Sequence, residues 1–203
     1  SLLPVLSLIQ KNQNSFFIIV LSSAIKCCFE NNIIPDLCFS TDGGYWAKEH
    51  LKILEKYPDA VLALSSESCC QKSILHKNPV LPLIYEDGIS KDLSIVSGID
   101  FYNAKRNGTV SGTALQFAME YSTGNIYFSG LDLHSQKGFQ HTNPNELQIN
   151  SQISDFKLSS AEKKQVSAML NSDSLKVYED WFCNFDIQNK KVFRIIEKKD
   201  RNN

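Results

Sequence analysis

Short apolar runs recur along the chain, and most are followed by a stretch whose apolar residues have helical spacing. Residues 16–21 form a continuous β-branched and aromatic run, which is typical of a strand covered on both faces. Further strands are predicted at residues 37–40, 60–64, 79–85, 125–129 and, as a closing edge strand, 191–196. Helices are predicted at residues 24–31, 45–57, 69–76, 111–121 and, with a break near 171–173, 160–185. This alternation predicts an α/β fold, a Rossmann-like three-layer sandwich with a mostly parallel sheet.

Two segments do not fit the alternation. Residues 86–107 have weak periodicity and are expected to be loops, and residues 135–160 are polar and predicted to form a surface loop or lid. No repeat or linker divides the chain, so residues 1–203 are predicted to be a single domain. Because the chain begins Ser1-Leu2-Leu3-Pro4 without a methionine, we expect it to be a fragment of a longer protein.

Composition narrows the function classes. Lys and Arg total 21 against 22 for Asp and Glu, and this balance disfavours a nucleic-acid partner. The apolar runs are too short to cross a bilayer, and no signal peptide is evident. The six cysteines form no CxxC pair and have no histidine at zinc-finger spacing, so no metal site is predicted from them. They suit small core residues in a reducing compartment, which favours a cytoplasmic location.

Polar turns follow several predicted strands, and the carboxyl ends of parallel strands are where ligands bind. These turns are Ser22-Ser23, Thr41-Asp42-Gly43-Gly44 and Ser129-Gly130-Leu131-Asp132. A further turn, residues 107–113 with Ser111-Gly112-Thr113 at its end, opens a helix, and its backbone N–H groups and the helix dipole suit a phosphate or carboxylate. An ordinary capped helix explains the same residues.

Two aspartates in these turns also have alternative roles. Asp42 is a candidate ligand for Mg²⁺, a ribose hydroxyl or a base amine, or it stabilises an Asx-turn or caps a helix. Asp132 either contacts a ligand or accepts backbone hydrogen bonds within its loop.

Histidines supply a candidate general base, because imidazole titrates near neutral pH. His134 and His141 flank the polar loop after the strand at residues 125–129. A solvated loop histidine is the plainer interpretation of both. His50 and His76 fall on predicted helices and are expected at the surface.

The stretch 110–137, VSGTALQFAMEYSTGNIYFSGLDLHSQK, resembles the central block of bacterial family-42 sialyltransferases. Together with Asn32-Ile33-Ile34-Pro35-Asp36 and Asp42, it also resembles a broader group that contains the motility accessory factors and the archaeal 6-hydroxymethylpterin diphosphokinases. Asn32 stands where that group has glycine, a change that is tolerable if φ stays negative or if asparagine adopts αL geometry. The resemblance covers residues 1–141 and implies a sialyltransferase-like fold. Ser1-Leu2 resembles the end of a nucleotide-binding Gly-Pro-Ser-Leu turn.

The resemblance implies a set of nucleotide-binding residues in this chain. They are Ser1, Ser22, Thr41, Asp42, Gly43, Ser111, Gly112, Thr113, Gly130 and Asp132. His141 is the positional counterpart of the sialyltransferase base, although in those enzymes the histidine lies further along the chain.

Three functions stay open at this point. The first is a glycosyltransferase-like domain that binds a CMP-activated nonulosonic acid and modifies flagellin or another surface acceptor, with no cofactor required. The second is a Mg²⁺-ATP-dependent diphosphokinase acting on hydroxymethylpterin, with Asp42 as the metal ligand. The third is a noncatalytic nucleotide-binding scaffold.

Overall fold

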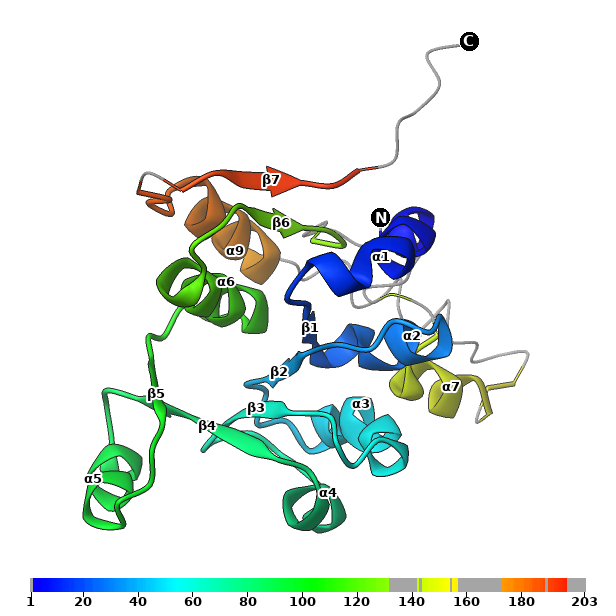
Figure 1. The fold of residues 1–203 in the computed structure, drawn as a ribbon. Coiled ribbons are helices and arrows are strands. Elements are labelled where there is room, and N and C mark those ends of the chain that lie inside the picture. Colours follow the sequence, from blue (N-terminus) through cyan, green and yellow to red (C-terminus); the bar gives the residue numbers. More distant parts are fainter. Residues whose placement is uncertain are drawn as a thin grey trace, which may run out of the picture.

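The structure, a computed structural model, describes residues 2–131, 142, 144–153, 155–156, 173–188 and 190–196. Its centre is a five-stranded parallel sheet with helices on both faces (Figure 1). This arrangement confirms the predicted α/β, Rossmann-like three-layer fold. Four residues singled out from the sequence, Ser1, Asp132, His134 and His141, lie outside the described residues.

The strands of the main sheet follow one another in chain order, β1-β2-β3-β4-β5. They are β1 (Ile19–Leu21), β2 (Leu37–Ser40), β3 (Leu62–Ser65), β4 (Val80–Tyr85) and β5 (Tyr102–Ala104). Parallel registers such as Val20 opposite Cys38 place all five carboxyl ends at one edge. A separate two-stranded parallel sheet joins β6 (Ile126–Phe128) to β7 (Val192–Arg194), so the last predicted strand pairs outside the main sheet.

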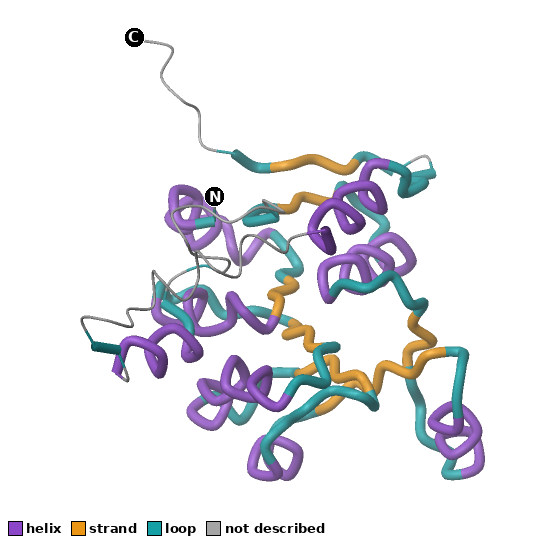
Figure 2. Tube along the Cα trace, turned by 180° about the vertical axis from the view of Figure 1, so that it is seen from behind, coloured by secondary structure: helices purple, strands orange, loops and turns teal. Residues whose placement is uncertain are grey.

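Each face of the main sheet has its own apolar core, because successive side chains of a strand point to opposite faces. Cys38 lies in a core with side chains of α2 (Ile25–Glu30), α3 (Lys48–Leu51) and α4 (Lys72–Lys77). Its neighbour Phe39 lies in the other core, under α6 (Val110–Tyr121), and its ring centroid is 5.4 Å from that of Phe117. Figure 2, seen from behind, shows the strands between these two helical layers.

Several predicted boundaries differ from the structure. The weakly periodic interval after β4 contains a helix, α5 (Ile89–Val96), and the edge strand β5. The helix predicted at residues 45–57 is broken into η4 (Tyr45–Ala47), α3 and η5 (Lys52–Lys56).

Helices also occur towards both ends of the chain. The interval 135–160, expected to be a loop or lid, contains α7 (Glu146–Ile153). Near the start of the chain, η1 (Leu3–Val5), α1 (Leu6–Asn12) and η2 (Gln13–Ser15) precede β1. Turn η3 (Ser22–Ala24) follows β1, and α9 (Asp173–Cys183) precedes β7.

Three smaller expectations can also be compared with the fold. Asn32 has φ 56°, the αL geometry that asparagine tolerates in place of glycine. Cys27, Cys28 and Cys38 are buried, as expected of core residues, whereas Cys69 and Cys70 are half-buried and Cys183 is exposed. Among the described helices, none is long and apolar enough to span a membrane.

Candidate functional site

A large cleft opens where the two sheets separate. The next strand after β5 does not pair with β5. Instead, α6 crosses back over the sheet, and β6 lies beyond β1, on the side away from β2 (Figure 1). The cleft between β1 and β6 has a volume of about 2430 Å³. Open α/β sheets bind their ligands at such a reversal of strand order, at the carboxyl ends of the flanking strands. The topology therefore marks this cleft as the candidate site.

The cleft brings together four of the nucleotide-binding residues predicted from the sequence: Ser22, Asp42, Ser111 and Gly130. Ser22 directly follows β1 and is buried, whereas Asp42 follows β2 and is exposed. The other predicted residues that the structure describes, Thr41, Gly43, Gly112 and Thr113, are not among the residues that line the cleft. Each of the four polar turns therefore contributes at least one residue to the cleft lining, and in two of them the neighbouring predicted residues lie outside it.

The loop after β2 is an Asx-turn that leaves its carboxylate at the cleft. Asp42 Oδ1 accepts a hydrogen bond from the N–H of Gly44 at 2.9 Å, and Asp42 O accepts one from the N–H of Cys69 at 3.1 Å. Gly43 lies against the next loop, and a Cβ there would be 2.7 Å from Glu67 O. Asp42 therefore has the structural role expected of an Asx-turn and also lines the cleft.

Helix α6 begins with a polar network around its N-cap, Thr109. Thr109 Oγ1 accepts a hydrogen bond from the N–H of Gly112 at 2.8 Å, which satisfies one donor of the first turn. Asn107 Oδ1 accepts from the N–H of Thr109 at 3.0 Å, and Asn107 Nδ2 donates to Gln116 Oε1 at 3.1 Å. Ser111 Oγ donates to Thr109 Oγ1 at 3.2 Å.

This network divides the predicted Ser111-Gly112-Thr113 turn by role. Gly112 is buried, and a Cβ on it would be 2.4 Å from Asn107 Oδ1, so a larger residue would displace the Asn107 side chain. Thr113 is also buried, and its hydroxyl donates to Thr109 O at 3.3 Å. Both residues stabilise the start of the helix, whereas Ser111 lines the cleft. Asn107 and Thr109, which make the cap, belong to the turn predicted at residues 107–113 but are not among the predicted nucleotide-binding residues.

On the β6 side, a glycine turn lines the cleft and packs against residues near the start of the chain. Gly130 has φ 78°, a backbone geometry that favours glycine. A Cβ at Gly130 would lie 3.1 Å from Leu2 Cβ, so the turn is in close contact with the residue that precedes η1. The rings of Phe16 and Tyr127, 5.8 Å apart, form a second bridge between the β1 and β6 sides.

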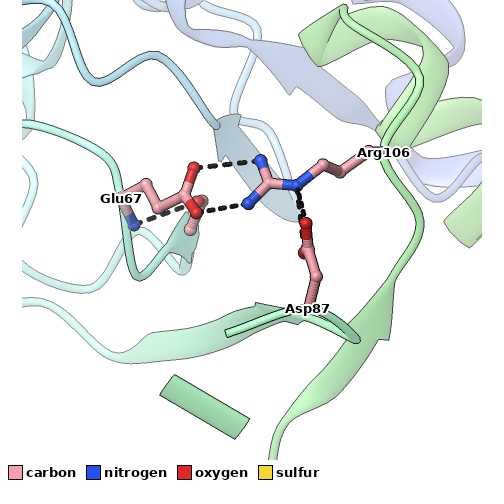
Figure 3. A network of polar contacts seen from close by, with 4 residues as sticks. Glu67, Asp87 and Arg106 are labelled. Carbon is pink, nitrogen blue, oxygen red and sulfur yellow. Dashed lines mark hydrogen bonds and ion pairs between the residues drawn. The ribbon is translucent and has the colours of Figure 1, made fainter. Parts of the chain in front are cut away.

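A cluster of charged residues occupies the same sheet edge, away from the cleft lining. Arg106, which follows β5, pairs with Glu67 after β3 and with Asp87 after β4 (Figure 3). Arg106 Nη1 lies 3.1 Å from Glu67 Oε2, and Arg106 Nε lies 2.7 Å from Asp87 Oδ2. Hydrogen bonds from the Arg106 guanidinium lower the pKa of Glu67 and the pKa of Asp87. These ion pairs connect the loops that follow β3, β4 and β5.

Two histidines differ from each other in burial. His76 on α4 is exposed, as expected, but the expectation that His50 lies at the surface is wrong. His50 on α3 is 6% exposed and lines the cleft. Its helix packs against η3, which carries Ser22, and against α7, so burial comes from contacts that helical periodicity does not reveal.

Charged groups are sparse in the cleft. Of the described residues that line it, the acidic and basic ones are Asp42, His50 and Arg194. Within the described part of the chain, no group of three or more His, Cys, Asp or Glu side chains is placed to hold a metal ion. Apolar side chains from β1, α6 and β6 form much of the remaining lining. A mainly apolar cavity with a few convergent polar groups is the usual form of a small-molecule site.

Comparison with known proteins gives two matches. A family model described as "6-hydroxymethylpterin diphosphokinase MptE-like" matches residues 1–138. An uncharacterized protein of Treponema pallidum (strain Nichols) is 31% identical over 170 residues, which cover 81% of this chain and 36% of that protein. The chain thus spans about a third of the length of this curated relative. Among solved structures, no match was found.

Proposed function

Because the chain belongs to the MptE-like family, we propose that its cleft binds a nucleotide-activated donor and that the protein is part of a transferase. The observation that most supports this proposal is the position of the cleft between β1 and β6. Its lining includes Ser22, Asp42, Ser111 and Gly130. This is where open parallel sheets bind nucleotides. The matched region, residues 1–138, includes both strands that flank the cleft.

The favoured donor is a CMP-activated nonulosonic acid, a nine-carbon acidic sugar. Its phosphodiester carries one charge, which suits a lining whose basic groups are His50 and Arg194 among the described residues. The first turn of α6 beside Ser111 can stabilise the phosphate through the helix dipole. Asp42 is placed to accept hydrogen bonds from a ribose hydroxyl or a base amine.

In this reaction an acceptor hydroxyl, for example on flagellin, attacks the anomeric carbon of the sugar. The bond from that carbon to the phosphate oxygen breaks, and CMP leaves with the electron pair. His141 accepts the proton of the acceptor hydroxyl as general base. His141→Ala should abolish turnover and preserve CMP binding, and unchanged turnover would remove His141 from this role.

A second candidate is the transfer of diphosphate from Mg²⁺-ATP to a hydroxymethylpterin. The description of the family model favours it, and so does the exposed carboxylate of Asp42 at the cleft, which could ligate Mg²⁺. The sparse charge of the described lining supports it less well, since a triphosphate needs more neutralisation than a phosphodiester.

A thermal-shift screen of CMP, CTP, ATP and GTP, each with and without Mg²⁺, separates the candidates. A ligand at a concentration of about 100 times its Kd stabilises the folded protein by about 2.7 kcal/mol. For a domain of this size, this raises the melting temperature by roughly 5–10 °C. A shift with CMP that is independent of Mg²⁺ supports the sugar transferase. A shift with ATP that requires Mg²⁺ and disappears in Asp42→Asn supports the diphosphokinase. If no nucleotide shifts the transition at millimolar concentration, nucleotide binding by this chain is refuted.

A further inference from the structure

A buried histidine lines the cleft, and the function proposed above names it only as one of two basic groups of the lining. His50 is 6% exposed, yet it is one of the residues that line the cleft. Ser22 lines the same cleft, is 7% exposed and belongs to η3, the turn against which the His50 helix packs. The lining of this mainly apolar cavity therefore includes two buried polar side chains, carried by elements that contact each other.

The location fits a contact with the ligand. Helix α3 follows the Asp42 loop, so His50 lies near the carboxyl edge of the sheet, where the four predicted nucleotide-binding residues border the cleft. Of the described lining residues, His50 and Arg194 are the two that can carry positive charge. Arg194 belongs to β7, which pairs with β6, so His50 is the basic group on the main-sheet side.

The charged side chains around α3 have partners of their own. Lys26 Nζ on α2 lies 2.6 Å from Glu146 Oε1 on α7. Glu49 on α3 accepts a hydrogen bond from Asn150 of α7 at 3.3 Å, and the Lys48 ammonium lies 3.8 Å from the centroid of the Tyr45 ring. Helix α3 also packs against both α2 and α7. The backbone that carries His50 is therefore supported by contacts with two helices, which favours a precise binding contact.

We propose that His50 is a ligand-binding residue of the cleft, whose imidazole donates a hydrogen bond to the phosphate of the bound nucleotide. The proposal rests on the proposed function, because it assumes that a nucleotide occupies the cleft. It assigns His50 to binding and leaves proton transfer to another residue. A histidine that serves only to pack α3 against α7 would affect folding and leave nucleotide affinity unchanged.

The test compares His50→Gln with His76→Gln, a matched substitution of the exposed histidine on α4. Affinity for CMP, or for Mg²⁺-ATP if that is the nucleotide bound, is measured by calorimetry on samples whose folding is checked by circular dichroism. Loss of a hydrogen bond to a charged group should weaken binding about tenfold or more in His50→Gln. His76→Gln should bind like the wild type. Equal affinity in all three proteins would overturn the proposal.

A measurement on the wild type covers the case in which His50→Gln does not fold. Imidazole NMR signals are followed during nucleotide titration and assigned with glutamine variants of the three other histidines, His76, His134 and His141. The His50 signal should shift and saturate with the calorimetric Kd, and a His50 signal that stays in place while nucleotide binds would refute the proposal. If the wild type binds no nucleotide, the proposed function itself fails; if it binds and His50 is unaffected, this assignment alone fails.

Discussion

Replacing Gly112 by alanine is the sharpest test of the network that begins α6. Glycine has a low helix propensity, and replacing it by alanine within a helix normally stabilises the protein by up to about 1 kcal/mol. At Gly112, however, the added Cβ would lie 2.4 Å from Asn107 Oδ1 and 2.9 Å from Thr109 Oγ1. Both atoms would have to move, and both accept hydrogen bonds that hold the cap.

The loss of stability expected for Gly112→Ala follows from the two hydrogen bonds that the added methyl group would disturb. Loss of the Thr109 cap costs about 1 kcal/mol, and loss of the hydrogen bond from the N–H of Thr109 to Asn107 costs about 1 kcal/mol. After the helix-propensity gain is subtracted, Gly112→Ala should destabilise the protein by about 1 kcal/mol. For a domain of this size, that corresponds to a melting temperature lower by roughly 2–4 °C.

The assay is thermal unfolding followed by circular dichroism, with Gly124→Ala as the control. Gly124 has nothing within 4 Å of an added Cβ, so its replacement should leave stability unchanged or slightly raise it. In an Asn107→Ala background the closest clash is absent, and Gly112→Ala should cost less than in the wild type. A melting temperature raised by Gly112→Ala, or an equal cost in both backgrounds, would refute the role assigned to Asn107.

Three further predictions concern other parts of the fold. Phe39→Ala should lower the free energy of unfolding by about 3–5 kcal/mol, since the ring is fully buried under α6, and an unchanged urea midpoint would contradict this. Arg106→Gln should raise the pKa of Glu67 in a carboxyl NMR titration. Because the pKa of Glu67 is lower in the folded than in the unfolded state, the ion pair stabilises the fold above the unfolded-state pKa. This stabilisation is lost as the pH falls through the folded-state pKa. A Glu67 pKa that does not change in Arg106→Gln would exclude the pairing. Burial raises the pKa of the Cys38 thiol to about 12, so a thiol reagent at neutral pH should label exposed Cys183 and leave Cys38 unlabelled unless the protein unfolds.

The parts of the fold that were predicted correctly have strong local signals. β2 was predicted at its observed bounds, Leu37–Ser40, because Pro35 precedes it and Asp42-Gly43-Gly44 follow it. β5 was missed since it has three residues, one of them exposed, and its position depends on pairing with β4. The separation of β6 and β7 from the main sheet also arises from long-range pairing, which periodicity does not encode.

The candidate site was predicted in part for the same reason. Ser22, Asp42 and Gly130 each lie within two residues of a strand's carboxyl end, so the rule that ligands bind at strand carboxyl ends led to them, and all three line the cleft. His50 was assigned to the surface, because its burial depends on the packing of α3 against η3 and α7. Within the α6 turn, sequence alone could not separate Ser111 at the cleft from Gly112 and Thr113 in the cap.

The strand order also has a consequence for how the chain folds. In the main sheet, every strand pairs with the strand that immediately precedes it, as Ile19 with Leu37 and Leu62 with Val80. Each pairing closes a short loop, so the sheet can grow from one edge as the chain leaves the ribosome. The pairing of Ile126 with Val192 closes a loop several times longer. We therefore expect the main sheet to form first, and the cleft to be completed in a later and slower step, when β7 joins β6.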